Sequence, residues 1–188
     1  MSKNKTISVI LERVFGSLTF LPIPISLLLW TFTEFPSRKI FGLPLVDGPI
    51  GFMGLSNTSV SVMSDLPSSL RLAGFMASLP LVGLQTYWLW QLKKLFGCYA
   101  RDKIFTVENT TYIKHTALAF LGIAFMSIFV GAALTLILTA NNPVGHRMVG
   151  VTFGTQQVSD ILTGFVLVVI AWIMDEGRKL KEEADYTV

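Results

Sequence analysis

Long runs without a charged side chain divide this sequence. Residues 14–33, 72–92 and 116–145 contain no Asp, Glu, Lys or Arg, and each run is at least as long as the ~20 apolar residues that cross a hydrocarbon core of about 30 Å. A fourth run, 161–174, reaches that length when residues 155–160 are added. The pattern predicts an all-α integral membrane protein, a single domain built as a four-transmembrane-helix bundle. We place the four helices at about 14–33, 72–92, 116–140 and 155–174.

The first predicted span differs from the others because it contains Pro22 and Pro24. Proline removes a backbone donor, so we expect a kink or a local unwinding of this helix. A cleaved signal peptide is the competing interpretation, since basic residues precede the run. The run is as long as a span and residues 31–35 lack a small-residue cleavage site, so we expect the segment to be retained.

Two polar residues within the spans are candidate intramembrane sites. Asp160 lies at the edge of the fourth span, and Gln85 lies in the second. An acid in an apolar stretch marks a functional site by default. Asp160 also fits a plain structural role, because water at the membrane surface lowers the cost of a charge there, and Gln85 fits a hydrogen bond between helices.

Composition and charge distribution support a membrane protein and give its orientation. Only 14% of residues are charged, against about 25% in soluble domains, and the mean hydropathy is +0.59. Three segments hold eleven of the fifteen Lys and Arg residues, so the positive-inside rule assigns these segments to the cytoplasm. The cytoplasmic segments are 1–13, 93–115 and 175–188, and the loops 35–71 and 141–154 are extracytoplasmic. The net charge of +3 reflects this topology and is no evidence for direct nucleic-acid binding.

Both outer loops contain a short segment in which apolar residues alternate with others. Val60 and Val62 alternate within residues 58–64, and Val149 and Val151 alternate within residues 148–153. A period of two is typical of strands. The two segments are predicted on the same side of the membrane, where they either pair into a small extracytoplasmic β element or form two irregular loops folded on the helix ends.

The inner loop predicts a sharp turn between two helices. We expect the second helix to continue to about Ala100 and the chain to turn at 101–103. A new helix then begins with Thr106 as its N-cap, Glu108 lies in the first turn, and Phe105 packs back onto the new helix as a hydrophobic staple.

The C-terminal segment continues the fourth span into the cytoplasm as a charged helix. Arg178–Glu182 and Lys179–Glu183 are spaced as i,i+4 ion pairs. Together with the inner loop, this segment resembles the bacterial membrane-protein family catalogued as domain of unknown function 2975. The residues that carry the resemblance are Leu95, Phe96, Tyr99, Phe105-Thr106-Val107-Glu108-Asn109, Leu180-Lys181-Glu182-Glu183 and Thr187-Val188.

The resemblance implies a location and a partner. The family has glycine at the turn position that Asp102 occupies here, and aspartate tolerates the left-handed backbone better than most residues. Members are often encoded beside a small helix-turn-helix regulator. This implies a multi-pass protein of the bacterial cytoplasmic (inner) membrane that forms a regulatory pair with that cytoplasmic protein.

The sequence offers no assembly of residues for catalysis or metal binding. His115 and His146 lie at opposite ends of the third span, about 45 Å apart at 1.5 Å per residue. Cys98 is the single cysteine, so no internal disulfide and no cysteine cluster is expected. We therefore expect no enzyme activity, no cofactor and no metal site.

The favoured interpretation is a regulatory or sensory membrane protein that acts through a cytoplasmic partner. An accessory subunit of a larger membrane complex, or a small oligomeric transporter or channel, remains the alternative, and all three interpretations place the chain in the lipid bilayer. We further expect Arg101 and Lys103 to meet Glu182 and Glu183 across the bundle in a weak contact, either as a static inner cap or as a switch between two states. The candidate docking residues are Arg101, Lys103, Phe105, Thr106, Glu108, Asn109, Leu180, Glu182 and Glu183.

Overall fold

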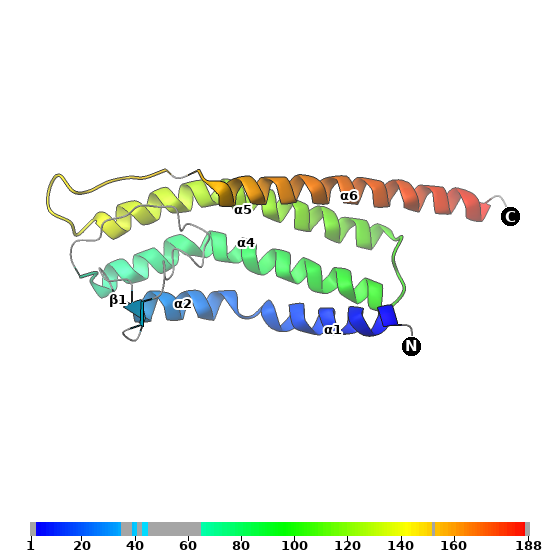
Figure 1. Cartoon of the computed structure of the whole chain (residues 1–188), viewed down its shortest axis with the longest axis horizontal. Helices are drawn as coiled ribbons and strands as arrows, with labels where there is room; N and C mark the ends of the chain where they lie inside the picture. Colours follow the sequence, from blue (N-terminus) through cyan, green and yellow to red (C-terminus); the bar gives the residue numbers. More distant parts are fainter. Residues whose placement is uncertain (1–2, 35–38, 41–42, 45–64, 152, 187–188) are drawn as a thin grey trace. The chain divides into compact units, whose positions relative to one another are not determined.

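Five helices make up most of the computed structural model, which describes residues 3–34, 39–40, 43–44, 65–151 and 153–186 (Figure 1). In chain order they are α1 Lys3–Leu18, α2 Pro22–Phe32, α4 Ser68–Ala100, α5 Val107–Thr139 and α6 Thr155–Tyr186. Within these residues, four helical segments are long and apolar enough to cross a membrane: Lys5–Phe32, Ser68–Ala100, Val107–Thr139 and Thr155–Ala184. The prediction of an all-α membrane protein with four spans is therefore confirmed.

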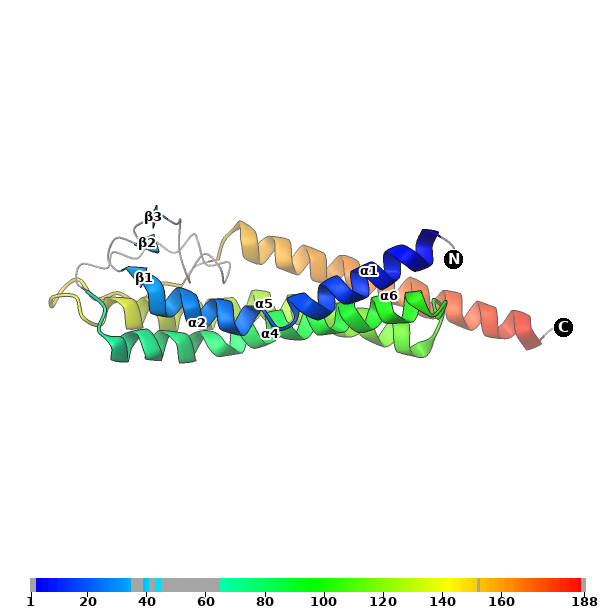
Figure 2. The same ribbon diagram turned by 90° about the horizontal axis from the view of Figure 1, so that it is seen from below.

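The first span is interrupted where the prolines predicted it. α1 ends at Leu18, and backbone hydrogen bonds from Phe20 N–H to the Ser17 carbonyl (3.3 Å) and from Leu21 N–H to the Leu18 carbonyl (3.2 Å) close a turn. α2 then begins at Pro22. Proline suits the first position of a helix, because the N–H it lacks has no helical partner there. Figure 2 shows the interruption between α1 and α2.

The helices contribute to two compact units. The first unit consists of Met1–Leu21, Gln85–Gly122 and Asp160–Val188, and the second consists of Pro22–Leu84 and Ile123–Ser159. α1 belongs to the first unit and α2 to the second, whereas α4, α5 and α6 each supply residues to both.

The first unit packs α4, α5 and α6 around a small apolar cluster. Leu95, Ile113 and Ala171 are its buried members, one from each helix. α5 and α6 approach closely at Gly164, where an added Cβ would lie 2.8 Å from Leu121 Cγ and 3.2 Å from the Ala117 carbonyl oxygen. Small residues at such contacts let helices associate in a membrane, where lipid already solvates the apolar side chains.

The second unit is centred on Trp30 of α2, which is 1% exposed. The indole lies directly over Gly74 of α4: a Cβ added there would lie 2.9 Å from Cζ2 and closer still to Cη2 and Cζ3. Leu81, Leu134 and Leu138 are also fully buried in this unit. Glycine at position 74 is therefore required by the packing of a large rigid ring.

A small β element does follow α2, but it uses other residues than those predicted. Three two-residue strands form an antiparallel sheet in the order β1-β2-β3 (Figure 2). They are β1 Thr33–Glu34, β2 Lys39–Ile40 and β3 Leu43–Pro44. The predicted strand at 58–64 lies outside the described residues.

The predicted strand at 148–153 is wrong for the residues that the structure describes there, because α5 satisfies this segment instead. Thr139 Oγ1 accepts a hydrogen bond from Met148 N–H (3.2 Å), and Thr135 Oγ1 accepts one from Gly150 N–H (2.8 Å). Each hydroxyl also donates to a carbonyl of its own helix. The amides of Met148 and Gly150, two residues apart, thus bond to two threonines one helical turn apart on α5. These amides need no partner strand.

Candidate functional site

The turn between α4 and α5, residues 101–106 of the first unit, holds most of the residues singled out from the sequence. We call it the inner turn, because it lies in the predicted inner loop. Lys103 N–H donates to the Cys98 carbonyl (3.0 Å), and Asp102 N–H donates to the Tyr99 carbonyl (3.2 Å). These two bonds form a Schellman motif, which requires a left-handed residue after the helix end. Asp102 supplies it with φ of 59°. The expectation that aspartate maintains the turn here is confirmed.

The start of α5 is capped as predicted. Asn109 N–H donates to Thr106 Oγ1 (3.3 Å), so Thr106 satisfies one of the free amides of the first turn. Glu108 lies in that turn, where its negative charge favours the positive end of the helix. Asn109 is fully buried, and its side-chain amide donates back to the Ile104 carbonyl. Asn109 thereby ties the turn to the helix, a role that the sequence did not indicate.

Phe105 has a different neighbour from the one predicted. Its ring lies against Gly177 of α6, where an added Cβ would be 3.3 Å from Phe105 Cε1. A hydrophobic staple would need an apolar side chain at the fourth position of α5, and that position is the polar Thr110. The ring therefore links the inner turn to α6, and it stays 47% exposed.

α1 meets the same turn through charged groups. Lys5 forms an ion pair with Asp102. Glu12 Oε1 and Arg101 Nη2 both approach Gly97 of α4, at 2.9 and 3.5 Å from the position of an added Cβ. The aspartate at the turn thus has a second role, because it holds the N-terminal helix as well as the backbone conformation.

The charged end of α6 pairs mainly with itself. Arg178 Nη1 lies 2.7 Å from Glu182 Oε1, and Arg178 Nη2 lies 3.3 Å from Asp175 Oδ1, so the predicted Arg178–Glu182 pair is confirmed. Lys179 pairs with Glu176 (3.3 Å) and Asp175 (3.8 Å) rather than with Glu183.

The contact expected across the bundle differs from the one observed. Glu182 is paired within α6, and among the ion pairs of the described residues neither Arg101 nor Lys103 reaches Glu182 or Glu183. An i,i+4 partner on the same helix is held at the right distance by the backbone, whereas a partner across the bundle is not. Leu180 is left 60% exposed on this charged segment.

The polar residues of the spans are more buried than expected. Asp160 is only 8% exposed within the protein and makes an interaction there. Gln85 is half-buried. A buried hydrogen bond that the sequence analysis missed joins Gln157 of α6 to Ser127 of α5, with Nε2 and Oγ 3.1 Å apart. In the first unit, Gln91 Nε2 lies 3.5 Å from His115 Nδ1.

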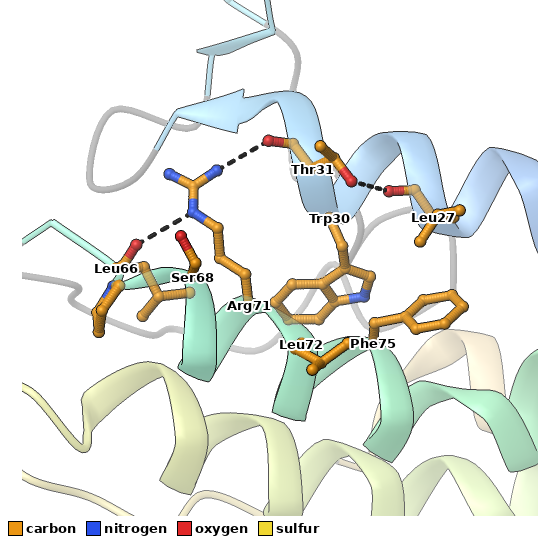
Figure 3. A pocket seen from close by; sticks show the side chains of 9 residues that line it. Leu27, Trp30, Thr31, Leu66, Ser68, Arg71, Leu72 and Phe75 are labelled. Atoms are coloured by element: carbon orange, nitrogen blue, oxygen red, sulfur yellow. Dashed lines mark hydrogen bonds between the residues drawn. The ribbon is translucent and has the colours of Figure 1, made fainter.

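The second unit contains a cavity of about 450 Å³ between α2 and α4 (Figure 3). Its walls are mainly apolar and include Leu27, Trp30, Leu72 and Phe75. Arg71 reaches across it: Nε donates to the Leu66 carbonyl (3.1 Å), and Nη1 donates to the Thr31 (3.0 Å) and Thr33 (2.9 Å) carbonyls. These last two carbonyls lie at the C-terminal end of α2, so Arg71 caps that helix from α4. No local pattern in the sequence indicates this role for Arg71.

No group of three or more His, Cys, Asp or Glu side chains with metal-binding geometry occurs among the described residues. What the geometry does build is a connected inner turn, held by Asp102, Thr106 and Asn109, that contacts α1 through Lys5 and α6 through Phe105.

Comparison with known proteins places this architecture in a family. No curated protein and no solved structure matches the chain. A family sequence model matches residues 54–188, which include the inner turn and the charged end of α6. The chain belongs to the family described as "Protein of unknown function (DUF2975)".

Proposed function

We propose that this protein is a regulatory or sensory component of the bacterial inner membrane that acts through a cytoplasmic partner protein. The observation that carries the proposal is the length of α6. Its 32 residues form one unbroken helix, about 48 Å long at 1.5 Å per residue. A hydrocarbon core is about 30 Å thick, so the last turns of α6 extend beyond it.

The extended end of α6 has the character of a docking helix. Arg178 is paired with Asp175 and Glu182 on its own helix. These charges therefore do not require partners elsewhere in the protein. Leu180 stays 60% exposed between these charges. An exposed apolar side chain with paired charges around it can bury against a partner without leaving a charge unpaired.

Contacts at both ends of α6 support a role in signal transmission. At its start, Gln157 Oε1 accepts a hydrogen bond from Gly154 N–H (2.9 Å), and Gln157 Nε2 donates to Ser127. Near its end, Gly177 packs against Phe105 of the inner turn. A change at either contact shifts one rigid helix. Two states that differ by a few kcal/mol suffice for a partner to distinguish them.

The partner class follows from the family resemblance. A small helix-turn-helix regulator in the cytoplasm is the expected partner, with both termini and the inner turn on the cytoplasmic side. DNA contact belongs to the partner in this account, and the membrane protein controls the partner's availability.

Purification of the full chain in mild detergent, with identification of co-eluting proteins, tests the proposal. Leu180→Ala should reduce partner recovery, whereas Leu162→Ala should not, because both leucines are 60% exposed on α6 and only Leu180 lies on the extended end. Deleting 182–188 should also reduce recovery while the protein still inserts and melts normally. Co-elution of a large membrane complex would favour an accessory subunit, and a bare homo-oligomer would favour a transporter or channel.

A further inference from the structure

A groove of about 670 Å³ runs between α1 and α4 in the first unit. The residues that matter for its chemistry are Glu12, Arg13, Gly16, Ser17, Phe20 and Lys93. None of the residues that line it belongs to the inner turn or to the end of α6, and the proposed function does not use it.

Two cations line this groove at the same level relative to the predicted spans. Arg13 is the last charged residue before the uncharged run 14–33, and Lys93 is the first one after the run 72–92. Both therefore mark the cytoplasmic boundary of their helices. Neither takes part in an ion pair among the residues that the structure describes.

The acid in the groove has a cation of its own nearby. The carboxylate of Glu12 lies over Gly97, and the guanidinium of Arg101 approaches the same glycine. Glu12 therefore contributes one negative charge to the groove. Arg13 and Lys93 leave the groove with a net positive charge.

A glycine allows Lys93 to lie across α1. A Cβ added at Gly16 would be 3.5 Å from Lys93 Cε and 3.9 Å from Lys93 Nζ. The aliphatic stem of the lysine therefore rests on α1, and its ammonium group stays over the floor of the groove. Lysine and arginine commonly extend along apolar surface in this way to place their charge at the membrane boundary.

The other end of the groove is apolar. Phe20 follows Arg13 by seven residues, lies just past the end of α1 at Leu18, and falls within the uncharged run. Its side chain is 76% exposed. The groove therefore combines two cations that have no ion-pair partner among the described residues with an exposed aromatic ring beyond the predicted membrane boundary.

We propose that this groove binds one anionic glycerophospholipid, with its phosphate between Arg13 and Lys93 and an acyl chain along Phe20. The charge pattern suits a headgroup, because both cations line one groove at the predicted membrane boundary. A zwitterionic lipid carries a choline or ethanolamine cation that these side chains would repel.

Native mass spectrometry of the full chain in detergent tests the site, with phosphatidylglycerol and phosphatidylcholine added in equal amounts. The wild type should retain one phosphatidylglycerol in preference to phosphatidylcholine. A basic side chain near an anionic headgroup contributes roughly fivefold in affinity, so Arg13→Gln with Lys93→Gln should weaken phosphatidylglycerol binding by about 25-fold. Lys114→Gln removes one exposed charge from α5, outside the groove, and should leave binding unchanged.

A steric variant tests the same groove without changing charge. Gly16→Leu should fill the floor and abolish the preferred lipid, whereas Gly83→Leu should not, because nothing lies within 4 Å of a Cβ added at Gly83. Equal binding by wild type, the double-charge variant and Gly16→Leu would overturn the proposal. Displacement of the lipid by millimolar inorganic phosphate would also overturn it, because the acyl chain is part of the proposed contact.

Discussion

The contact between Trp30 and Gly74 gives a prediction whose size follows from the structure. A Cβ at position 74 would lie 2.9 Å from Trp30 Cζ2 and nearer to two other ring atoms, whereas carbon atoms pack at about 3.5–4.0 Å. The ring is 1% exposed and has little room to retreat. We expect Gly74→Ala to cost about 1–3 kcal/mol through overpacking, partly offset by about 1 kcal/mol of gained helix propensity.

Gly83→Ala, on the same helix, isolates the packing term. A methyl group there meets nothing within 4 Å, so it should show the propensity gain alone. The difference between the two variants should be about 1–3 kcal/mol, or roughly 2–12 °C in melting temperature for a chain of this size. Thermal unfolding in detergent, followed by tryptophan fluorescence or near-ultraviolet circular dichroism, measures this difference.

A double-mutant cycle tests the cause directly. Trp30→Phe shortens the ring and removes the atoms that overlap an alanine at position 74. Gly74→Ala should therefore cost less in the Trp30→Phe background than in the wild type, with a coupling of about 1 kcal/mol or more. Equal melting temperatures for Gly74→Ala and Gly83→Ala, or no coupling in the cycle, would refute the packing argument.

Three further predictions concern the inner turn and the outer loop. Thr106→Ala should destabilise the fold by about 0.5–2 kcal/mol in chemical or thermal unfolding. Thr111→Ala should cost less, because the Thr111 hydroxyl donates to the Val107 carbonyl of its own helix and caps no free amide. Thr139→Val removes the acceptor for the Met148 amide, so hydrogen exchange at that amide should accelerate while Thr111→Val leaves it unchanged. Asp102→Gly should lie within about 1 kcal/mol of the wild type, because relief of the left-handed backbone offsets the lost exposed ion pair. Asp102→Ala should cost about 1–2 kcal/mol in the same unfolding experiment.

Local patterns in the sequence were sufficient for features that depend on neighbouring residues. The interruption at Pro22 and the cap at Thr106 involve groups within a few residues of each other, as does the left-handed turn at Asp102. The four spans follow from run length and charge alone. Backbone constraints act between neighbouring residues, and the free energy of transfer into the membrane depends on the composition of one segment. Both can therefore be predicted from the sequence without the tertiary fold.

Contacts between distant residues could not be predicted in this way. Arg71 ends the predicted loop 35–71, and nothing near it in the sequence indicates a partner. Its guanidinium donates hydrogen bonds to the Thr31 and Thr33 carbonyls, about forty residues earlier in the chain. Gln157 and Ser127 are thirty residues apart, and neither has a neighbour in the sequence that indicates the hydrogen bond between them. Which helix faces come together decides these bonds, and no local period encodes that choice.

The misassigned strand at 148–153 and the misplaced charge contact have the same origin. The alternation at 148–153 predicted a strand, but the hydroxyls of Thr135 and Thr139 accept the hydrogen bonds from the Met148 and Gly150 amides. Glu182 pairs with Arg178 of its own helix and not with a residue of the inner turn. In both cases a nearer partner satisfied the group, and the longer-range contact was not required.

Membrane topology is the measurement that tests the central claim most directly, because the proposed function requires the inner turn and the end of α6 to lie in the cytoplasm. A reporter that is active only outside the cytoplasm should give no signal when fused after Val188, and it should be active when inserted near Asn57. A second fusion at the 101–103 turn should be silent as well. Activity after Val188 and at the turn, with silence near Asn57, would contradict the orientation and remove the basis for a cytoplasmic partner.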